Sequence, residues 1–233
     1  MNRPGLRALR RLAAALLVVC AAVVTVPVPA GAVTYGTVVA YPSRTIPWLL
    51  PLFYSRTGAD DASFVCSTSA LSPREVLTAA HCVQQRGFYY VLVGADTLSG
   101  GHLVPIEVIT DHSRYTSRSV MNDAAIMRPL FPLGLRAYAR LAPPELIQRI
   151  STPSPPTLKL VAWGRNQNRR VNGYLHSALV RPQGKTARAA FGRYFRPDLM
   201  LAAGRYLPRL GIYAGACHGD SGGPLVAMRK GTP

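Results

Sequence analysis

The sequence is short of acidic residues. It carries 10 Asp and Glu residues against 27 Lys and Arg residues, a formal net charge of +17 at pH 7. Such an imbalance favours contact with polyanions such as nucleic acids, acidic glycans or anionic lipids. No nucleic-acid-binding motif accompanies the charge, so we expect no specific nucleic-acid partner.

The excess charge is concentrated in the second half of the chain. Asp198 is the single acid between positions 161 and 210, where the basic residues are Arg165, Arg169, Arg170, Arg181, Lys185, Arg188, Arg193, Arg196, Arg205 and Arg209. The simpler interpretation is a solvated basic face, and polyanion binding through this half stays open as an alternative.

Long apolar runs are also scarce. The run at positions 12–26 follows Arg3, Arg7, Arg10 and Arg11 and is followed by Ala30-Gly31-Ala32. This order is typical of a secretory signal with a small-residue cleavage site. The run is short for a membrane-spanning helix and ends in prolines. The sequence therefore predicts a signal peptide over residues 1–32, a secreted, extracellular protein starting at Val33 and no stable membrane anchor.

Cysteine is scarce too, with four residues in all. Cys20 lies in the predicted signal, which leaves Cys66, Cys82 and Cys217. Secretion permits disulfides, and an odd cysteine then has a partner elsewhere or is a free thiol.

The rest of the chain lacks long helical periodicity. Short runs rich in β-branched and aromatic residues recur instead, between turn residues, at positions 48–54, 76–80, 88–93, 103–109, 124–127, 159–163, 175–180 and 224–228. This pattern predicts an all-β sandwich or barrel. A proline-rich connector over 143–156 divides it, so we expect two β units, 33–145 and 146–233, with a cleft at their interface.

Three polar residues stand at informative places along this pattern. Ser221 lies beside an acid in the glycine-dense stretch 215–224, Asp123 immediately precedes an apolar run, and His81 follows one. No Lys-Ser/Thr follows the glycines, which excludes a phosphate-binding loop. His81 is next to Cys82, but no second Cys/His pair stands at ligand spacing, so we predict no metal and no cofactor.

Four motifs in this order carry a resemblance to a known family. They are Thr78-Ala79-Ala80-His81-Cys82, Asn122-Asp123-Ala124-Ala125-Ile126-Met127, Ala162-Trp163-Gly164 and Gly219-Asp220-Ser221-Gly222-Gly223-Pro224. With them the chain resembles the trypsin-like (chymotrypsin-fold) serine endopeptidases, from about residue 33 to 233. The resemblance implies two antiparallel six-stranded β-barrels, the first carrying His81 and Asp123 and the second carrying Ser221.

The resemblance also implies a role for each matched residue. Ser221 is the nucleophile, His81 the general base and Asp123 the residue that orients the imidazole. The backbone amides of Gly219 and Ser221 form the oxyanion hole. Cys66 and Cys82 match a disulfide that braces the histidine loop.

A further implied pair concerns the mature N-terminus. Asp220 would pair with the α-ammonium of the first mature residue and so order the oxyanion loop. Val33-Thr34-Tyr35-Gly36 is similar to the start of mature family members, and Val38-Val39 is a second candidate.

The chain departs from the family pattern at several positions. Gly215, in the specificity pocket, replaces the acid of a trypsin-type pocket, so we expect a small or apolar P1 residue. His218 stands near the pocket mouth, as a solvent-exposed histidine or as a contact for acidic substrates. Ala202 stands where a cysteine is usual. The family pattern also continues with further strands and a C-terminal helix, so we expect an incomplete second barrel and impaired activity.

The sequence therefore predicts a secreted serine endopeptidase that acts on proteins or peptides. The alternative is an inactive protein of the same fold that binds polyanions through its basic half.

Overall fold

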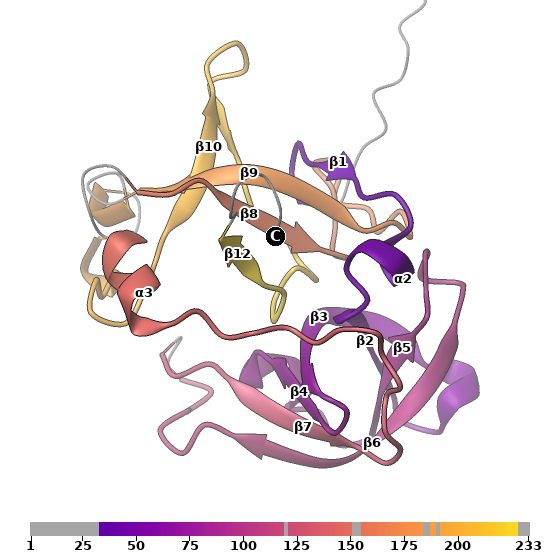
Figure 1. Cartoon of the computed structure of the whole chain (residues 1–233). Coiled ribbons are helices and arrows are strands. Elements are labelled where there is room, and N and C mark those ends of the chain that lie inside the picture. The colour runs from indigo at the N-terminus through magenta and orange to yellow at the C-terminus, as the bar shows by residue number, and fades with distance from the viewer. Residues whose placement is uncertain (1–32, 119–120, 151–154, 184–186, 190–191, 228–233) are drawn as a thin grey trace, which may run out of the picture.

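The computed structural model describes residues 33–118, 121–150, 155–183, 187–189 and 192–227 (Figure 1). The predicted signal peptide, residues 1–32, lies outside these ranges. No helix within the described ranges is long and apolar enough to cross a membrane.

The first half is a closed antiparallel barrel. Its strands follow the order β2-β3-β4-β7-β6-β5. They are β2 (Leu49–Ser55), β3 (Ser63–Ser72), β4 (Glu75–Thr78), β5 (Phe88–Val93), β6 (His102–Asp111) and β7 (Ala125–Pro129). Fully buried side chains of four different strands fill its centre, namely Leu52, Val76, Val91 and Met127. On β7, buried residues alternate with exposed ones, as expected for a strand with one face on a core.

The second half is an open antiparallel sheet in the part of the chain that is described. Its order is β11-β10-β9-β8-β12, and β1 (Thr37–Val38) pairs with β9. The other strands are β8 (Leu158–Ala162), β9 (His176–Pro182), β10 (Ala203–Leu207), β11 (Ile212–Ala214) and β12 (Leu225–Ala227). Figure 1 shows this sheet above the barrel, with the β10–β11 hairpin protruding. The predicted all-β architecture is confirmed.

Helices are short and lie outside the sheets. They are α2 (Pro42–Thr45), α3 (Pro144–Ile150), and the 3-10 turns η1 (Ala59–Asp61), η2 (Ala80–Val83) and η3 (Gly192–Tyr194). The helix α3 lies in the proline-rich stretch that the sequence indicated as a plain connector. Its Leu146 and Ile150 pack into the apolar cluster beneath the second sheet. The connector therefore contributes to the core of the second half.

The first described residues also belong to the second sheet. Val33 is fully buried in the same apolar cluster as Leu158 and Val180. Val38 pairs with His176 on β9. The predicted unit 33–145 thus begins with residues that lie along the other half of the molecule.

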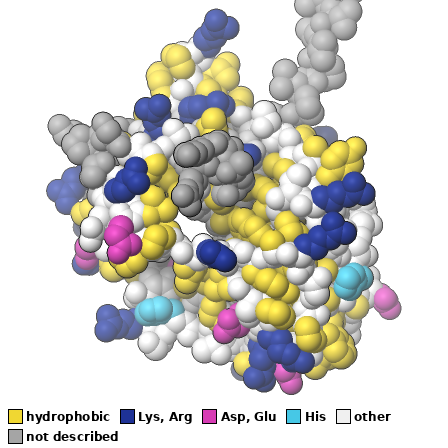
Figure 2. Space-filling model, in the orientation of Figure 1, with side chains coloured by type: hydrophobic (Ala, Val, Ile, Leu, Met, Phe, Trp, Pro, Cys, Tyr) yellow, Lys and Arg dark blue, Asp and Glu magenta, His cyan; other side chains and the backbone are white. Residues whose placement is uncertain are grey.

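Surface charge follows the sequence. Every described arginine between positions 161 and 210 is exposed. Dark-blue side chains are spread over the face in Figure 2, including the tip of the protruding hairpin. Arg196 donates to Asp198 at 2.8 Å, an exposed ion pair.

Candidate active site

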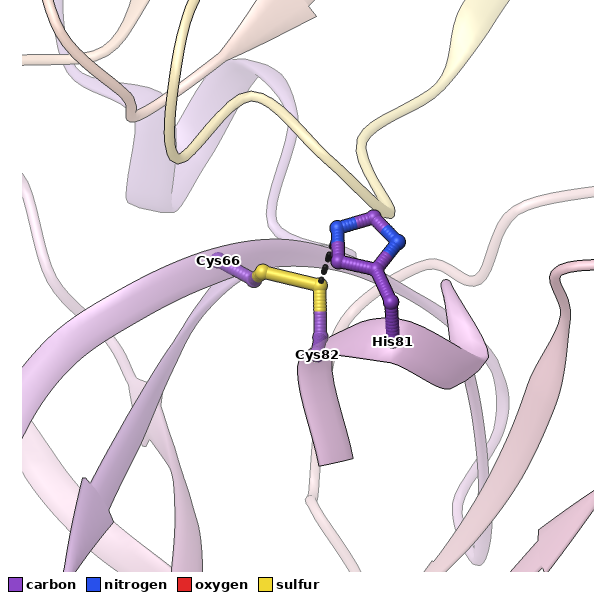
Figure 3. Close-up of side chains that lie close together, drawn as sticks. All are labelled: Cys66, His81 and Cys82. Carbon is purple, nitrogen blue, oxygen red and sulfur yellow. Dashed lines mark hydrogen bonds between the residues drawn. A yellow bond between two sulfur atoms is a disulfide. The ribbon is translucent and has the colours of Figure 1, made fainter. Parts of the chain in front are cut away.

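His81 lies on a short turn that a disulfide holds against the barrel. It belongs to η2, which follows β4, and its neighbour Cys82 is bonded to Cys66 of β3 (Figure 3). The S–S distance is 2.05 Å and the Cα–Cα distance 6.2 Å. The predicted disulfide is therefore present, and it limits the movement of the histidine backbone.

The same three residues form a cluster of the kind that binds metals. The ligand atoms of Cys66, His81 and Cys82 lie within 4.8 Å of one another. Both sulfur atoms are bonded to each other, so neither is a thiolate that could hold zinc. The cluster therefore does not suit a metal.

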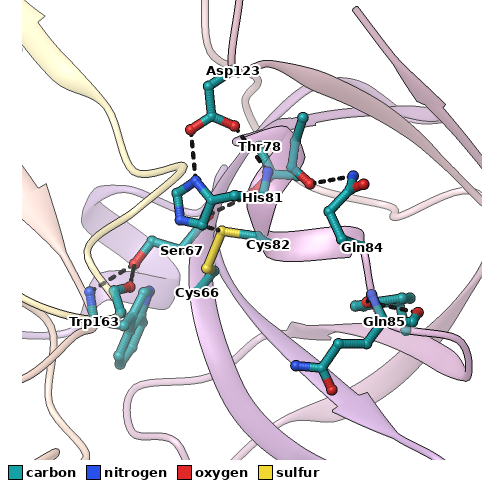
Figure 4. Close-up of a disulfide and its surroundings, with 12 residues drawn as sticks. Cys66, Ser67, Thr78, His81, Cys82, Gln84, Gln85, Asp123 and Trp163 are labelled. Carbon is teal, nitrogen blue, oxygen red and sulfur yellow. Dashed lines mark hydrogen bonds and ion pairs between the residues drawn. A yellow bond between two sulfur atoms is a disulfide. The ribbon is translucent and has the colours of Figure 1, made fainter. Parts of the chain in front are cut away.

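Asp123 makes two hydrogen bonds with His81 (Figure 4). His81 Nδ1 lies 2.6 Å from Asp123 Oδ2, and the His81 backbone amide donates to Asp123 Oδ1 at 2.8 Å. Asp123 lies two residues before the start of β7, at the mouth of the apolar run that the sequence indicated. A carboxylate at Nδ1 favours the tautomer with the proton on Nδ1, which leaves Nε2 able to accept a proton. The His81 side chain is 49% exposed and that of Asp123 23%, so the pair opens to solvent.

The loop carrying Ser221 reaches the barrel beside this pair. The Ser67 amide of β3 donates to the Ser221 carbonyl at 2.9 Å. A Cβ at Gly222 would collide with Ser67 O and Thr78 Oγ1, so the approach requires glycine there, where φ is +77°. Ser67 follows Cys66, and Thr78 ends the strand before His81. These contacts place the serine loop next to the histidine turn, and Figures 3 and 4 both show the yellow loop beside the imidazole.

The structure shows no hydrogen bond between His81 Nε2 and the Ser221 hydroxyl. Within the described residues, Nε2 instead lies 3.7 Å from Cys82 Sγ. A catalytic hydrogen bond is often long before substrate binds and shortens in the complex.

The amides of Gly219 and Ser221, the predicted oxyanion-hole donors, make no hydrogen bond to any described residue, and neither do those of His218 and Gly222 in the same loop. Gly219 has a φ of +88°, which suits glycine. Free neighbouring amides of this kind can bind a developing oxyanion.

Asp220 is a buried carboxylate, with 3% of its surface exposed. Its side chain accepts from Gly164 N at 2.9 Å and from Cys217 N at 2.7 Å. The Val33 amide is a third donor. Burial outweighs these hydrogen bonds and raises the pKa of Asp220 from 3.8 to about 6. The structure thus brings the two predicted partners, Val33 and Asp220, together.

The comparisons with known proteins agree with this geometry. The Trypsin family model matches residues 35–232. This chain belongs to the trypsin family.

Curated family members share a little over a quarter of their residues with it. It is 29% identical to trypsin iota of Drosophila melanogaster over 80% of this chain and 71% of that protein. It is 29% identical to phenoloxidase-activating factor 3 of Holotrichia diomphalia, covering 78% of this chain and 56% of that protein. For brachyurin of Leptuca pugilator the identity is 27%, over 71% of this chain and 72% of the relative.

A solved structure shows the same fold. Neuropsin, a serine protease expressed in the limbic system of mouse brain, superposes with a TM-score of 0.66 at 21% identity. The match covers 83% of this chain and 82% of neuropsin. The closed barrel with a second sheet is thus the chymotrypsin-like architecture that the motifs indicated.

The remaining predicted positions lie around the serine loop. Gly215 is half-buried, exchanges hydrogen bonds with Thr34, and has open space where a Cβ would stand. His218 is exposed. Ala202 is half-buried. Cys217 has a free, half-buried thiol with no disulfide partner among the described residues.

One polar residue at this site escaped the sequence analysis. Ser67 is completely buried, and its hydroxyl accepts from Trp163 N at 3.0 Å and donates to Gly219 O at 3.1 Å. No motif includes it. Its only signal in the sequence was its place directly after Cys66.

Proposed function

We propose that this family member is a serine endopeptidase in which His81, Asp123 and Ser221 form the catalytic triad. The observation that carries the proposal is the two-point contact between Asp123 and His81, at 2.6 Å and 2.8 Å. This contact holds an imidazole with Nε2 available, on a turn beside the only predicted nucleophile. The family comparison supports the same reaction class.

The reaction follows from these positions. His81 Nε2 takes the Ser221 hydroxyl proton as the oxygen attacks the peptide carbonyl. The amides of Gly219 and Ser221 stabilise the resulting oxyanion. His81 then gives the proton to the leaving amine, which produces an acyl-enzyme. Water, deprotonated by the same imidazole, hydrolyses the ester and restores Ser221.

Signal cleavage is the proposed trigger for ordering the loop. Cleavage after Ala32 would convert the Val33 amide, already at the Asp220 carboxylate, into an α-ammonium. An ion pair would then replace a neutral hydrogen bond at a buried carboxylate. N-terminal sequencing of the secreted protein tests this, and a first residue other than Val33 contradicts it.

Specificity is proposed to favour small or apolar P1 residues. Gly215 offers no side chain to pair with a cationic substrate, and its surroundings are open. A library of peptide substrates that differ only at P1 tests this, and preferred cleavage after Arg or Lys contradicts it.

Labelling with a fluorophosphonate tests the triad directly. The secreted chain should be labelled, and Ser221→Ala should abolish both labelling and casein hydrolysis while secretion remains equal. Ser55→Ala is a matched control, because Ser55 is a buried serine of β2 whose hydroxyl accepts from Thr57 N and Gly58 N rather than contacting the loop. Equal labelling of the wild type and Ser221→Ala contradicts the assignment.

A second candidate is polyanion binding without catalysis. It draws on the exposed arginines of positions 161–210. Salt-sensitive retention on heparin by a chain that no fluorophosphonate labels supports this candidate against the first.

A further inference from the structure

Ser67 lies where the barrel meets the serine loop, and it contacts that loop twice. Its hydroxyl donates to Gly219 O at 3.1 Å, and its amide donates to Ser221 O at 2.9 Å. The hydroxyl also accepts from Trp163 N at 3.0 Å, and Thr78 Oγ1 donates to Ser67 O at 3.1 Å. This serine is therefore fully satisfied and completely buried.

The carbonyl groups of residues 217–221 all accept hydrogen bonds. The donors, in order, are Asp220 N at 3.0 Å, Arg165 N at 2.6 Å, Ser67 Oγ at 3.1 Å, Gly223 N at 2.9 Å and Ser67 N at 2.9 Å. Four of these donors are backbone amides, which no substitution short of proline removes. Only the carbonyl of Gly219 is held by a side chain.

These hydrogen bonds restrain the backbone of Gly219, which as a glycine has the widest range of φ and ψ. Each peptide unit is a rigid plane, so a held carbonyl fixes the amide on the other side of that plane. The plane before Gly219, which contains the Gly219 amide, is held through His218 O. The plane after it is held through Gly219 O by Ser67 and through Asp220 N, which donates to Cys217 O at 3.0 Å. Glycine has no Cβ to restrict it, so without the Ser67 hydroxyl this second plane keeps one of its two anchors and can turn about Gly219.

We propose that Ser67 is a positioning residue for the oxyanion hole, whose hydroxyl fixes the Gly219–Asp220 peptide and with it the relative orientation of the Gly219 and Ser221 amides on either side of it. The inference rests on the proposed endopeptidase function. Ser67 touches neither substrate nor the reacting atoms, and it acts through Gly219. Loss of one oxyanion donor costs about 10²–10³ in rate, so loosening one should cost about ten- to a hundredfold.

The test compares Ser67→Ala with Thr68→Val in the secreted full chain. Thr68 is the next residue of β3, equally buried, and its hydroxyl donates to Leu50 O at 2.9 Å, away from the loop. Ser67→Ala should lower kcat about ten- to a hundredfold, leave KM within about threefold, and weaken binding of a peptide boronate by the same factor as kcat. Thr68→Val should lower the melting temperature and leave kcat unchanged. Unchanged kcat in Ser67→Ala overturns the inference.

A crystal structure of Ser67→Ala separates this inference from the proposed function. Rotation of the Gly219–Asp220 peptide supports positioning by Ser67, and an unchanged peptide overturns it, whatever the activity. Failure of the wild type to react with fluorophosphonate overturns the endopeptidase proposal instead. If Ser67→Ala is not secreted, Ser67→Cys, a much weaker donor of similar size, serves for the same measurements.

Discussion

The two halves of the molecule hold their parts of the site by different means. The barrel presents His81 from a turn tied by a disulfide and closed around an apolar core. The second half presents Ser221 from a glycine loop anchored by buried polar contacts to Asp220 and Ser67. Covalent and apolar restraints tolerate changes of pH, whereas buried polar contacts depend on charge and on each partner being present. The serine half should therefore be the more sensitive to pH and to the loss of a single polar partner.

The largest expected effect lies at the barrel's own polar contact. Asp123→Asn should lower kcat about 10⁴-fold, because an amide at Nδ1 favours the wrong imidazole tautomer. Stopped assays on a peptide ester measure it, and Asp111→Asn is the control, since Asp111 accepts from Gln84 rather than from His81. A loss below about tenfold would mean that Asp123 does not orient the base.

The next largest effect is expected on stability, where Gly222 of the serine loop lies against Ser67 and Thr78 of the barrel. Gly222→Ala should destabilise the fold by about 4 kcal/mol, because left-handed strain adds to a collision with Ser67 O and Thr78 Oγ1. Gly173→Ala is the matched control, with a similar φ of +85° and nothing near its Cβ, and should cost about 1 kcal/mol. Urea unfolding compares them, and equal losses would show that the close approach is unimportant.

Removal of the disulfide tests the covalent restraint of the barrel. Cys66→Ala with Cys82→Ala should lower the free energy of unfolding by about 3 kcal/mol, because a cross-link over 16 residues restricts the unfolded chain. Cys217→Ala, which removes a free thiol, should change it little. Thermal unfolding compares the two variants, and an equal loss of stability in both would show that the disulfide does not stabilise the barrel more than the free thiol stabilises the second half.

The pH dependence should come from the serine half. Because the pKa of folded Asp220 is about 6 against 3.8 unfolded, the folded state holds an extra proton between these values. The contribution of Asp220 to stability is therefore fully present below about pH 4 and is lost, by up to about 3 kcal/mol, as pH rises through 6. Asp220→Asn should remove this fall in the unprocessed chain, and so should an ammonium at Val33 in a chain starting there. Urea unfolding at pH 4 and pH 7 measures the change in the free energy of unfolding. The same fall in Asp220→Asn as in the wild type would contradict the assignment of this pH dependence to Asp220.

The sequence predicted most strands but missed one of the most important. The expected run 88–93 coincides with β5, and 48–54 and 103–109 overlap β2 and β6. β3 went unrecognised because its centre, Ser67-Thr68-Ser69, is polar yet buried. Burial of these hydroxyls requires partners such as Leu50 O and Gly219 O, which lie far away in the sequence.

The sequence motifs by themselves indicated which residues are the candidates for catalysis. A histidine, an aspartate and a serine in four spaced motifs indicated the family, the reaction and the disulfide before any coordinates. Tertiary structure alone decided how these groups are held. It supplied the two-point contact between Asp123 and His81 and the burial of Asp220, and it placed the Ser67 hydroxyl between Trp163 N and Gly219 O, which no motif indicated. The physical reason is that the hydrogen bonds of Ser67 join residues about 100 to 150 positions apart, so they depend on how the two halves pack, which no local pattern encodes.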